Sequence, residues 1–167
     1  MELRIDEQIG IYTVKKKLSS SHSIALSYLV RDPEQTPWIL KTIKNDQIEH
    51  LFHEIEILRL LEKSGLTNII SLGQLYESRF LIRPYQEGKT LDTYCQEVGC
   101  FSEEHIRKIL GKLVPILLQL QRNIPPIIHN EIQPQNILLN ETEDVFLLDF
   151  TTACHIGEEP VFAARHS

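Results

Sequence analysis

The segment "IIHNEIQPQNILLNETEDVFLLDFTTA" (Ile127–Ala153) decides the fold that we expect for this chain. Its apolar runs "NILL" and "VFLLDF" flank the polar turn "NETED", and this pattern predicts a short β-hairpin. The hairpin would bring the Asn136 amide close to the Asp149 carboxylate. Two such oxygen groups, completed by phosphate oxygens and water, suit a Mg²⁺ ion bound to a nucleotide. Two ordinary turn residues beside strands are the alternative interpretation.

The first 85 residues predict a small antiparallel sheet with one helix. The extended runs are "IYTVKKKL", "SIALSYLV", "WILKTI", "NIISLGQLYES" and "RFLIRPY". Between the third and fourth runs, apolar residues recur at helical spacing from Ile48 to Leu61, after a capping-box pattern that begins at Asp46. Lys41 on a strand and Glu54 on this helix could pair, and the pair would present a fixed positive charge to phosphate oxygens.

Residues 86–167 form the second predicted lobe, which is mainly helical, so the fold class is α+β with two lobes. The boundary falls in "YQEGK" (residues 85–89). A short helix over residues 90–98 precedes a longer one capped by Ser102. Pro115 lies inside the longer helix and predicts either a bend there or strong packing against neighbouring elements. The apolar stripe expected to face the core consists of Ile106, Ile109, Leu113, Leu117 and Leu120.

Composition narrows the classes of function. The chain has 167 residues, 42% of them hydrophobic, and a formal net charge of −6, which argues against nucleic acid as the main partner. Its three cysteines lack C-x-x-C spacing, so neither a disulfide framework nor a zinc site is indicated. No segment is typical of a signal peptide or a membrane span. We therefore expect a cytoplasmic location and no membrane partner.

The ordered series of motifs resembles the protein kinase superfamily, and specifically the bacterial eukaryotic-type Ser/Thr kinases. "WILK" resembles the V-A-I-K strand, and "HEIEILRLL" resembles the C helix. "HNEIQPQNILL" is similar to the catalytic loop H-R-D-L-K-P-E-N, and "LLDF" to the start of D-F-G. The resemblance covers nearly the whole chain and implies a two-lobe kinase fold: a five-stranded antiparallel sheet with the C helix, then a mainly helical lobe.

The resemblance also implies roles for individual residues, with ATP and Mg²⁺ as cofactors and a protein as substrate or partner. The implied catalytic residues are Glu131, Lys41 and Glu54. The implied metal ligands are Asn136 and Asp149. The implied nucleotide contacts are Lys41, Ser19, Ser21, Leu26, Arg83 at the gatekeeper position and Tyr85 in the hinge.

Departures from the family pattern fall on residues that carry chemistry. Ser19, Ser21 and Ile24 stand where the family has the three glycines of G-x-G-x-x-G, which weakens the predicted phosphate cradle. In the catalytic loop and D-F-G motif, four further residues differ from the family: Asn130 for arginine, Glu131 for aspartate, Gln133 for lysine and Thr151 for glycine. The longer Glu131 side chain would misplace a base, and Gln133 removes a charge that transferring phosphate requires.

Three functions follow from this pattern. The first is a pseudokinase-type signalling or binding module with a retained but weakened ATP/Mg²⁺ site. The second is an active Ser/Thr protein kinase that uses Glu131 as base. The third is a small-molecule phosphotransferase, because "HN" followed by a carboxylate also resembles the H-N-D loop of choline and aminoglycoside kinases. Ser167 falls within the expected activation segment, so we expect a degenerate kinase domain, either a fragment or a natural C-terminal truncation.

Overall fold

The computed structural model describes residues 2–19, 25–43, 48–63, 74–76 and 80–158. The chain divides into two compact units, Met1–Ile55 with Ser71–Gln86, and Glu56–Ile70 with Glu87–Ser167. These units differ from the predicted lobes, residues 1–85 and 86–167, because residues 56–70 belong to the second unit. The lobe boundary expected in "YQEGK" stays a prediction. The predicted helix cap at Asp46 and the nucleotide contact predicted at Ser21 lie outside the described residues.

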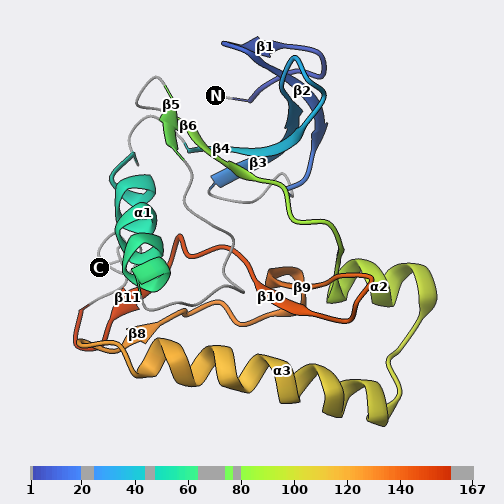
Figure 1. Cartoon of the computed structure of the whole chain (residues 1–167), viewed down its shortest axis with the longest axis vertical. Coiled ribbons are helices and arrows are strands. Elements are labelled where there is room, and N and C mark those ends of the chain that lie inside the picture. The colour runs from blue at the N-terminus through green and yellow to red at the C-terminus, as the bar shows by residue number, and fades with distance from the viewer. Residues whose placement is uncertain (1, 20–24, 44–47, 64–73, 77–79, 159–167) are drawn as a thin grey trace, which may run out of the picture. The chain divides into compact units, whose positions relative to one another are not determined.

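The first unit contains an antiparallel sheet (Figure 1). Its strands are β1 (Gln8–Ile9), β2 (Tyr12–Lys17), β3 (Ala25–Arg31), β4 (Pro37–Ile43), β5 (Gln74–Tyr76) and β6 (Phe80–Pro84). Their order in the sheet is β1-β2-β3-β4-β6-β5. The predicted five-stranded antiparallel sheet is therefore confirmed, and the two-residue strand β1 extends its edge beyond the prediction.

The two faces of this sheet bury different side chains because residues alternate along each strand. Tyr28, Val30 and Leu40 are fully buried in the larger apolar cluster, where the Tyr28 hydroxyl accepts a hydrogen bond from the Leu3 amide at 3.0 Å. Ala25 and Leu81 lie on the opposite face and pack with Ile55 of helix α1 (Ile48–Lys63). The second cluster therefore joins α1 to the sheet within this unit.

The second unit contains two capped helices, α2 (Leu91–Val98) and α3 (Glu103–Gln121). The Thr90 hydroxyl accepts from the Thr93 amide at the start of α2, and the Ser102 hydroxyl accepts from the His105 amide at the start of α3. These caps satisfy amides that have no partner within the helix. Helix α3 continues through Pro115, which is exposed; the bend expected there stays a prediction.

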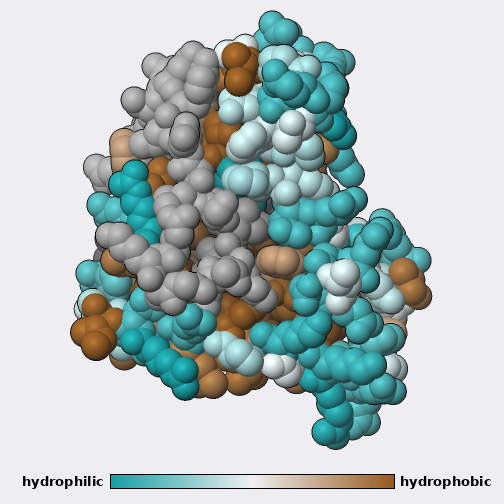
Figure 2. Space-filling model, in the orientation of Figure 1, coloured by the Kyte–Doolittle hydropathy of each residue, from teal (hydrophilic) through white to brown (hydrophobic). Residues whose placement is uncertain are grey.

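The buried face of α3 differs from the predicted stripe. Its buried residues are Ile109, Leu113, Ile116 and Leu120, so Ile116 takes the place expected for Leu117. Ile106, the first residue of the predicted stripe, is 45% exposed. Exposed apolar residues recur at every fourth position: Ile106, Leu110, Val114 and Leu118. Figure 2 shows hydrophobic surface along the edge where α3 lies, so the apolar arc of this helix is wider than its buried face.

Short strands complete the second unit. Strands β9 (Ile137–Leu139) and β10 (Val145–Leu147) form the predicted hairpin, and β7 (Lys89–Thr90) pairs with β9. A single 3-10 turn (Pro134–Asn136) precedes β9, while β8 (Ile127–Ile128) pairs with β11 (Cys154–His155). Gly88 has φ +148°, and a Cβ there would lie 2.7 Å from the Leu139 carbonyl oxygen, so this position requires glycine. None of the described helices is long and apolar enough to cross a membrane.

Candidate functional site

A buried ion pair joins strand β4 to helix α1. The Lys41 ammonium donates to both carboxylate oxygens of Glu54, at 2.9 Å and 2.7 Å. The two side chains are only 3% and 4% exposed. Each buried charge is thus matched by its partner, and the hydrogen bonds fix the orientation of the ammonium. The pairing expected from sequence is present, and it supplies a fixed positive charge on this face of the sheet.

Strand register determines which predicted nucleotide contacts share the face of Lys41. Ser27 and Leu81 lie directly opposite Lys41, and Arg83 lies two residues further along the same strand as Leu81. Alternation along the strands therefore places Arg83 on the Lys41 face, where it is half-buried. Leu26 has the opposite orientation and packs against the larger apolar cluster. The structure does not bring Leu26 to the Lys41 face; Ala25 and Ser27 occupy it instead.

The remaining predicted contacts in this unit are Ser19 and Tyr85. The Ser19 side-chain oxygen accepts a hydrogen bond from the Ser27 amide at 3.0 Å. This bond closes the end of the β2–β3 hairpin, as does the Leu18 amide, which donates to the Ser27 carbonyl at 2.8 Å. Ser19 therefore supports the backbone at a position where the kinase pattern has glycine. Tyr85 follows β6 directly and is half-buried.

In the second unit, His129 anchors the loop that carries Glu131. His129 is 3% exposed, and its Nε2 lies 2.9 Å from the Leu148 carbonyl oxygen. The Glu131 amide donates to His129 Nδ1 at 3.2 Å. Nδ1 must then be the acceptor, so the proton of the neutral ring is on Nε2 and is donated to Leu148. The Phe150 ring packs edge-to-face against the imidazole, with the two ring centroids 4.7 Å apart. His129 is therefore a structural residue of this loop, as its bonding pattern differs from that of a proton shuttle.

Asn130 ties the same loop to the segment that follows Asp149. Its side-chain amide donates to the Thr152 carbonyl at 2.8 Å and to Cys154 Sγ at 3.2 Å. The Thr152 hydroxyl returns a bond to the His129 carbonyl at 3.2 Å. Asn130 has φ +66°, a left-handed conformation that asparagine tolerates better than most residues. A neutral residue at the position of the family's arginine thus braces the loop without a charged partner.

Glu131 and Asn136 are linked through the backbone. Asn136 is 8% exposed, and its amide nitrogen donates to the Glu131 carbonyl at 3.0 Å. The Leu148 amide donates to the Asn136 carbonyl at 2.8 Å, which extends the β9–β10 ladder by one position. Within the described residues, the side-chain oxygen of Asn136 accepts no hydrogen bond. That oxygen is a suitable metal ligand, and Glu131, for which the kinase resemblance implies the role of base, is half-buried.

Asp149 comes two residues after β10 and has a left-handed backbone, with φ +60°. Its Oδ1 accepts from the Thr151 amide at 3.2 Å and from the Thr151 hydroxyl at 2.5 Å. Thr151 is buried, so the residue at the glycine position of the kinase pattern orients the carboxylate. The sequence showed the substitution at Thr151 but gave no indication of this hydrogen bond.

The hairpin brings the two predicted metal ligands to one end of the second unit. Asn136 precedes β9 and Asp149 follows β10, on the same side of a paired ladder. Among the described residues, no three His, Cys, Asp or Glu side chains gather in a way that could hold a metal ion. Two oxygen ligands nevertheless fit Mg²⁺, which commonly takes one or two protein groups and completes its octahedron with phosphate oxygens and water. The residues present therefore fit a nucleotide-borne ion.

Comparison with known proteins agrees with this geometry. The family model of the protein kinase domain matches residues 12–165. Human serine/threonine-protein kinase 32B is 33% identical over 113 residues, which cover 68% of this chain and 27% of that protein. The mouse phosphorylase b kinase gamma catalytic chain, liver/testis isoform, is 33% identical over 62% of this chain and 25% of its own length. A Dictyostelium discoideum protein, probable inactive serine/threonine-protein kinase samkD, is 34% identical over 67% and 21%.

The matched segments thus span about a quarter of the length of these relatives. Within the chain, the match extends over both units and includes the Lys41–Glu54 pair, the Glu131 loop and Asp149. This chain belongs to the protein kinase superfamily.

Proposed function

We propose that this chain is a pseudokinase-type domain that binds ATP and Mg²⁺ weakly and acts chiefly by binding protein. The observation that carries this proposal is the state of the Glu131 loop. Its backbone is held by neutral hydrogen bonds of His129 and Asn130, while the side chains that would perform phosphoryl transfer are substituted. A domain that keeps the hydrogen bonds of this loop but lacks the side chains for catalysis can still bind a partner protein. It would transfer phosphate inefficiently.

Nucleotide binding is retained in this proposal because the charged and oxygen groups remain. The Lys41 ammonium is oriented by Glu54, and such a fixed charge favours phosphate oxygens. Asn136 and Asp149 supply oxygen ligands for Mg²⁺, which itself neutralises phosphate charge. Binding is weak because Ser19 stands at a glycine position and its oxygen already accepts the Ser27 amide. The metal therefore contributes much of the affinity.

An active Ser/Thr protein kinase is the second candidate, and the half-buried Glu131 carboxylate at the base position favours it. Two of the relatives named above carry kinase activity in their names, whereas the third is named as probably inactive. A positioned base is worth about 10²–10⁴-fold in rate. A small-molecule phosphotransferase is disfavoured, because the matching family and relatives are protein kinases.

Transfer of phosphate from ATP to a generic protein substrate separates the two candidates. The blank is Asp149→Asn, which removes a metal ligand and reports any contaminating kinase. We expect the parent chain to match the blank. Activity that exceeds the blank and disappears in Glu131→Gln would establish the enzyme and identify the base, and it would overturn our proposal.

Nucleotide binding is tested separately by thermal shift. At about 100-fold excess over Kd, a ligand adds about 2.7 kcal/mol to the free energy of unfolding. We expect millimolar ATP with Mg²⁺ to add clearly less than this, and ATP without Mg²⁺ to add less still. Saturation at low micromolar ATP without metal would contradict the weak-binding part of the proposal and leave the phosphate-transfer result unaffected.

A further inference from the structure

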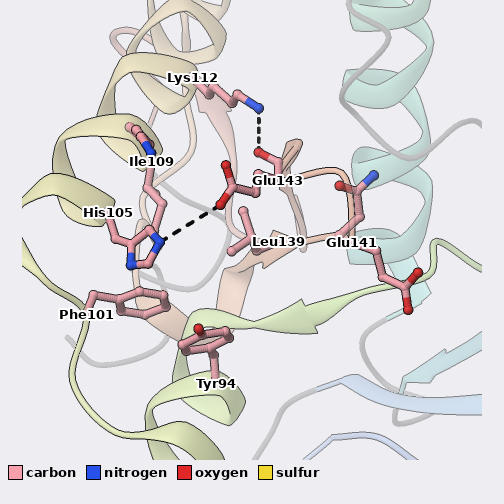
Figure 3. Close-up of a pocket in the computed structure, with 10 residues that line it drawn as sticks. Tyr94, Phe101, His105, Ile109, Lys112, Leu139, Glu141 and Glu143 are labelled. Carbon is pink, nitrogen blue, oxygen red and sulfur yellow. Dashed lines mark hydrogen bonds and ion pairs between the residues drawn. The ribbon is translucent and has the colours of Figure 1, made fainter.

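A pocket of about 290 Å³ lies within the second unit, where helices α2 and α3 meet the β9–β10 hairpin (Figure 3). It contains none of the residues of the candidate kinase site. The lining residues are Tyr94, Phe101, His105, Lys108, Ile109, Lys112, Leu139, Asn140, Glu141 and Glu143. Its volume is near the lower limit of small-molecule sites and suits a single long side chain.

One wall of the pocket is apolar and aromatic. The rings of Tyr94 and Phe101 are stacked, with centroids 4.5 Å apart and an interplanar angle of 16°. The His105 ring lies edge-to-face with the Phe101 ring, and their centroids are 6.5 Å apart. Ile109 and Leu139 provide aliphatic surface beside these rings (Figure 3). Stacked aromatic faces carry negative potential, so this wall can accept both a methylene chain and a cation.

The ammonium groups of both pocket lysines already contact carboxylate or carbonyl oxygens of the protein. The Lys108 ammonium lies 3.1 Å from a Glu104 carboxylate oxygen, one helical turn away. The Lys112 ammonium donates to the Glu143 carbonyl at 2.6 Å and lies 3.4 Å from the Asp144 carboxylate. These contacts compensate the positive charges, so the pocket is a poor site for an anion.

Among the described residues, the two carboxylates that line the pocket accept no hydrogen bond, although Lys108 lies near enough to attract the Glu143 carboxylate. Glu143 faces His105, with its Oε1 3.9 Å from His105 Nε2, beyond hydrogen-bond distance. Within the described residues, the Glu141 side chain forms no hydrogen bond or ion pair. Two lysines are therefore surrounded by four carboxylates: Glu104, Glu141, Glu143 and Asp144. Glu143 lies on the side of the aromatic wall, whereas the Glu141 side chain points away from the two rings (Figure 3).

We propose that this pocket binds an arginine side chain presented by an extended segment of a partner protein. The methylenes of the arginine pack on Ile109 and Leu139, and the planar guanidinium lies over the outer face of the stacked Tyr94–Phe101 pair. Glu143 accepts its N–H groups, because a guanidinium forms charge-assisted bonds to carboxylates and stacks on aromatic faces. The exposed Glu141 adds negative charge at the rim of the pocket. The inference concerns a surface separate from the kinase site and holds whether or not the chain transfers phosphate.

Fluorescence anisotropy with the whole chain tests this proposal. The probe is the fluorescein-labelled, amidated peptide Gly-Ser-Leu-Arg-Leu-Ser-Gly. The same peptide with citrulline keeps the shape of arginine and removes its charge, and the peptide with glutamate reverses the charge. The double variant Glu141→Gln/Glu143→Gln removes the acceptor at Glu143 and both negative charges that line the pocket. Lys108→Gln is the matched control, because it removes a charge from the same rim without removing an acceptor for arginine.

We expect the arginine peptide to bind at least about tenfold more tightly than the citrulline peptide, and the double variant to lose about tenfold or more. Lys108→Gln should leave binding unchanged or strengthen it. Amide NMR shifts on binding should centre on Phe101, His105 and Leu139. No binding at millimolar peptide, equal binding of citrulline, tighter binding of glutamate, or shifts elsewhere would each overturn the proposal. Unchanged circular dichroism of both variants excludes misfolding as the cause of any loss.

Discussion

The Lys41–Glu54 pair and the Glu131 loop maintain their geometry in opposite ways. In the first unit, two full charges are buried and hold each other directly. In the second unit, neutral hydrogen bonds from His129, Asn130 and Asn136 hold the backbone, while Glu131 and Asp149 remain half-buried. Removing one partner of a buried ion pair lowers the free energy of unfolding strongly. Removing one neutral hydrogen bond from a network lowers it by a smaller amount. The two regions should therefore respond differently to single substitutions.

Glu54→Gln should have the largest effect, because it removes the carboxylate that accepts both hydrogen bonds from the buried Lys41 ammonium. Breaking a buried ion pair from one side costs about 3–5 kcal/mol in the free energy of unfolding. Urea denaturation monitored by circular dichroism measures this loss. Glu56→Gln, an exposed position two residues along α1, should stay within about 0.5 kcal/mol of the parent.

The double variant Lys41→Met/Glu54→Leu sharpens the same test. It removes both charges and keeps apolar volume, and such replacements are often neutral or stabilising. We expect it to be more stable than Glu54→Gln alone. If the double variant loses as much stability as the single one, the loss comes from packing, and the isolated-charge explanation is wrong.

Asn136→Ala should have an intermediate effect. It removes the donor to the Glu131 carbonyl at a position that is only 8% exposed. An unsatisfied buried partner costs about 1–3 kcal/mol, so unfolding should begin at lower urea concentration. Gln135→Ala, at the exposed preceding residue, should be close to neutral. Equal losses at the two positions would show that the buried amide does not brace the loop.

Asn130→Gly should cost less, about 0.5–1.5 kcal/mol for the lost bonds to Thr152 and Cys154. Glycine is the appropriate probe because it accepts the left-handed backbone of Asn130 without strain. Glu143→Gly is the matched control, since Glu143 is exposed and also has a positive φ of 59°. We expect no loss in the control. A loss in the control as large as that of Asn130→Gly would point to backbone entropy instead of the side-chain bonds.

The smallest effect should come from Asp32, a half-buried carboxylate on the surface of the first unit. A hydrogen bond from the Trp38 indole at 2.9 Å holds the pKa of the Asp32 carboxyl below its ordinary value, with help from the Thr36 amide. A lowered folded-state pKa contributes stability above the unfolded-state pKa, and this contribution is lost as pH falls through the folded value. Trp38 is the single tryptophan, so its fluorescence reports the titration.

The fluorescence midpoint should lie below the ordinary aspartate pKa of 3.8. Asp32→Asn should abolish this transition while leaving the neutral-pH spectrum nearly unchanged. A midpoint at or above the ordinary value would show that the indole bond is absent in solution.

The sequence alone determined the type and order of the longer elements, whereas the two-residue strands β1, β7, β8 and β11 were not predicted. Extended apolar runs identified strands β2 to β6 of the sheet, and helical spacing identified α1 and α3. The Lys41–Glu54 pair was also predictable, because the strand and helix motifs that carry the two residues could be recognised from their neighbours. The β9–β10 hairpin followed in the same way from two apolar runs around a polar turn.

Only the tertiary structure decided which way several of these side chains face. Strand register turned Leu26 away from Lys41 and placed Ser27 opposite it. The packing of α3 buried Ile116 and left Ile106 exposed, although both belong to one continuous apolar arc. Periodicity identifies an element but leaves its rotation and register open, because these depend on contacts with distant segments.

The same limit applies to the hydrogen bonds of the site and to the arginine pocket. The sequence shows that Thr151 and Asn130 replace other residues of the kinase pattern. Only the folded structure shows that Thr151 donates to Asp149 and that Asn130 donates to Thr152. The pocket joins Tyr94, Phe101, Leu139 and Glu143, which are separated by up to about fifty residues along the chain. Local pattern fixes each segment, whereas a site built from several segments is fixed only when long-range packing brings them together.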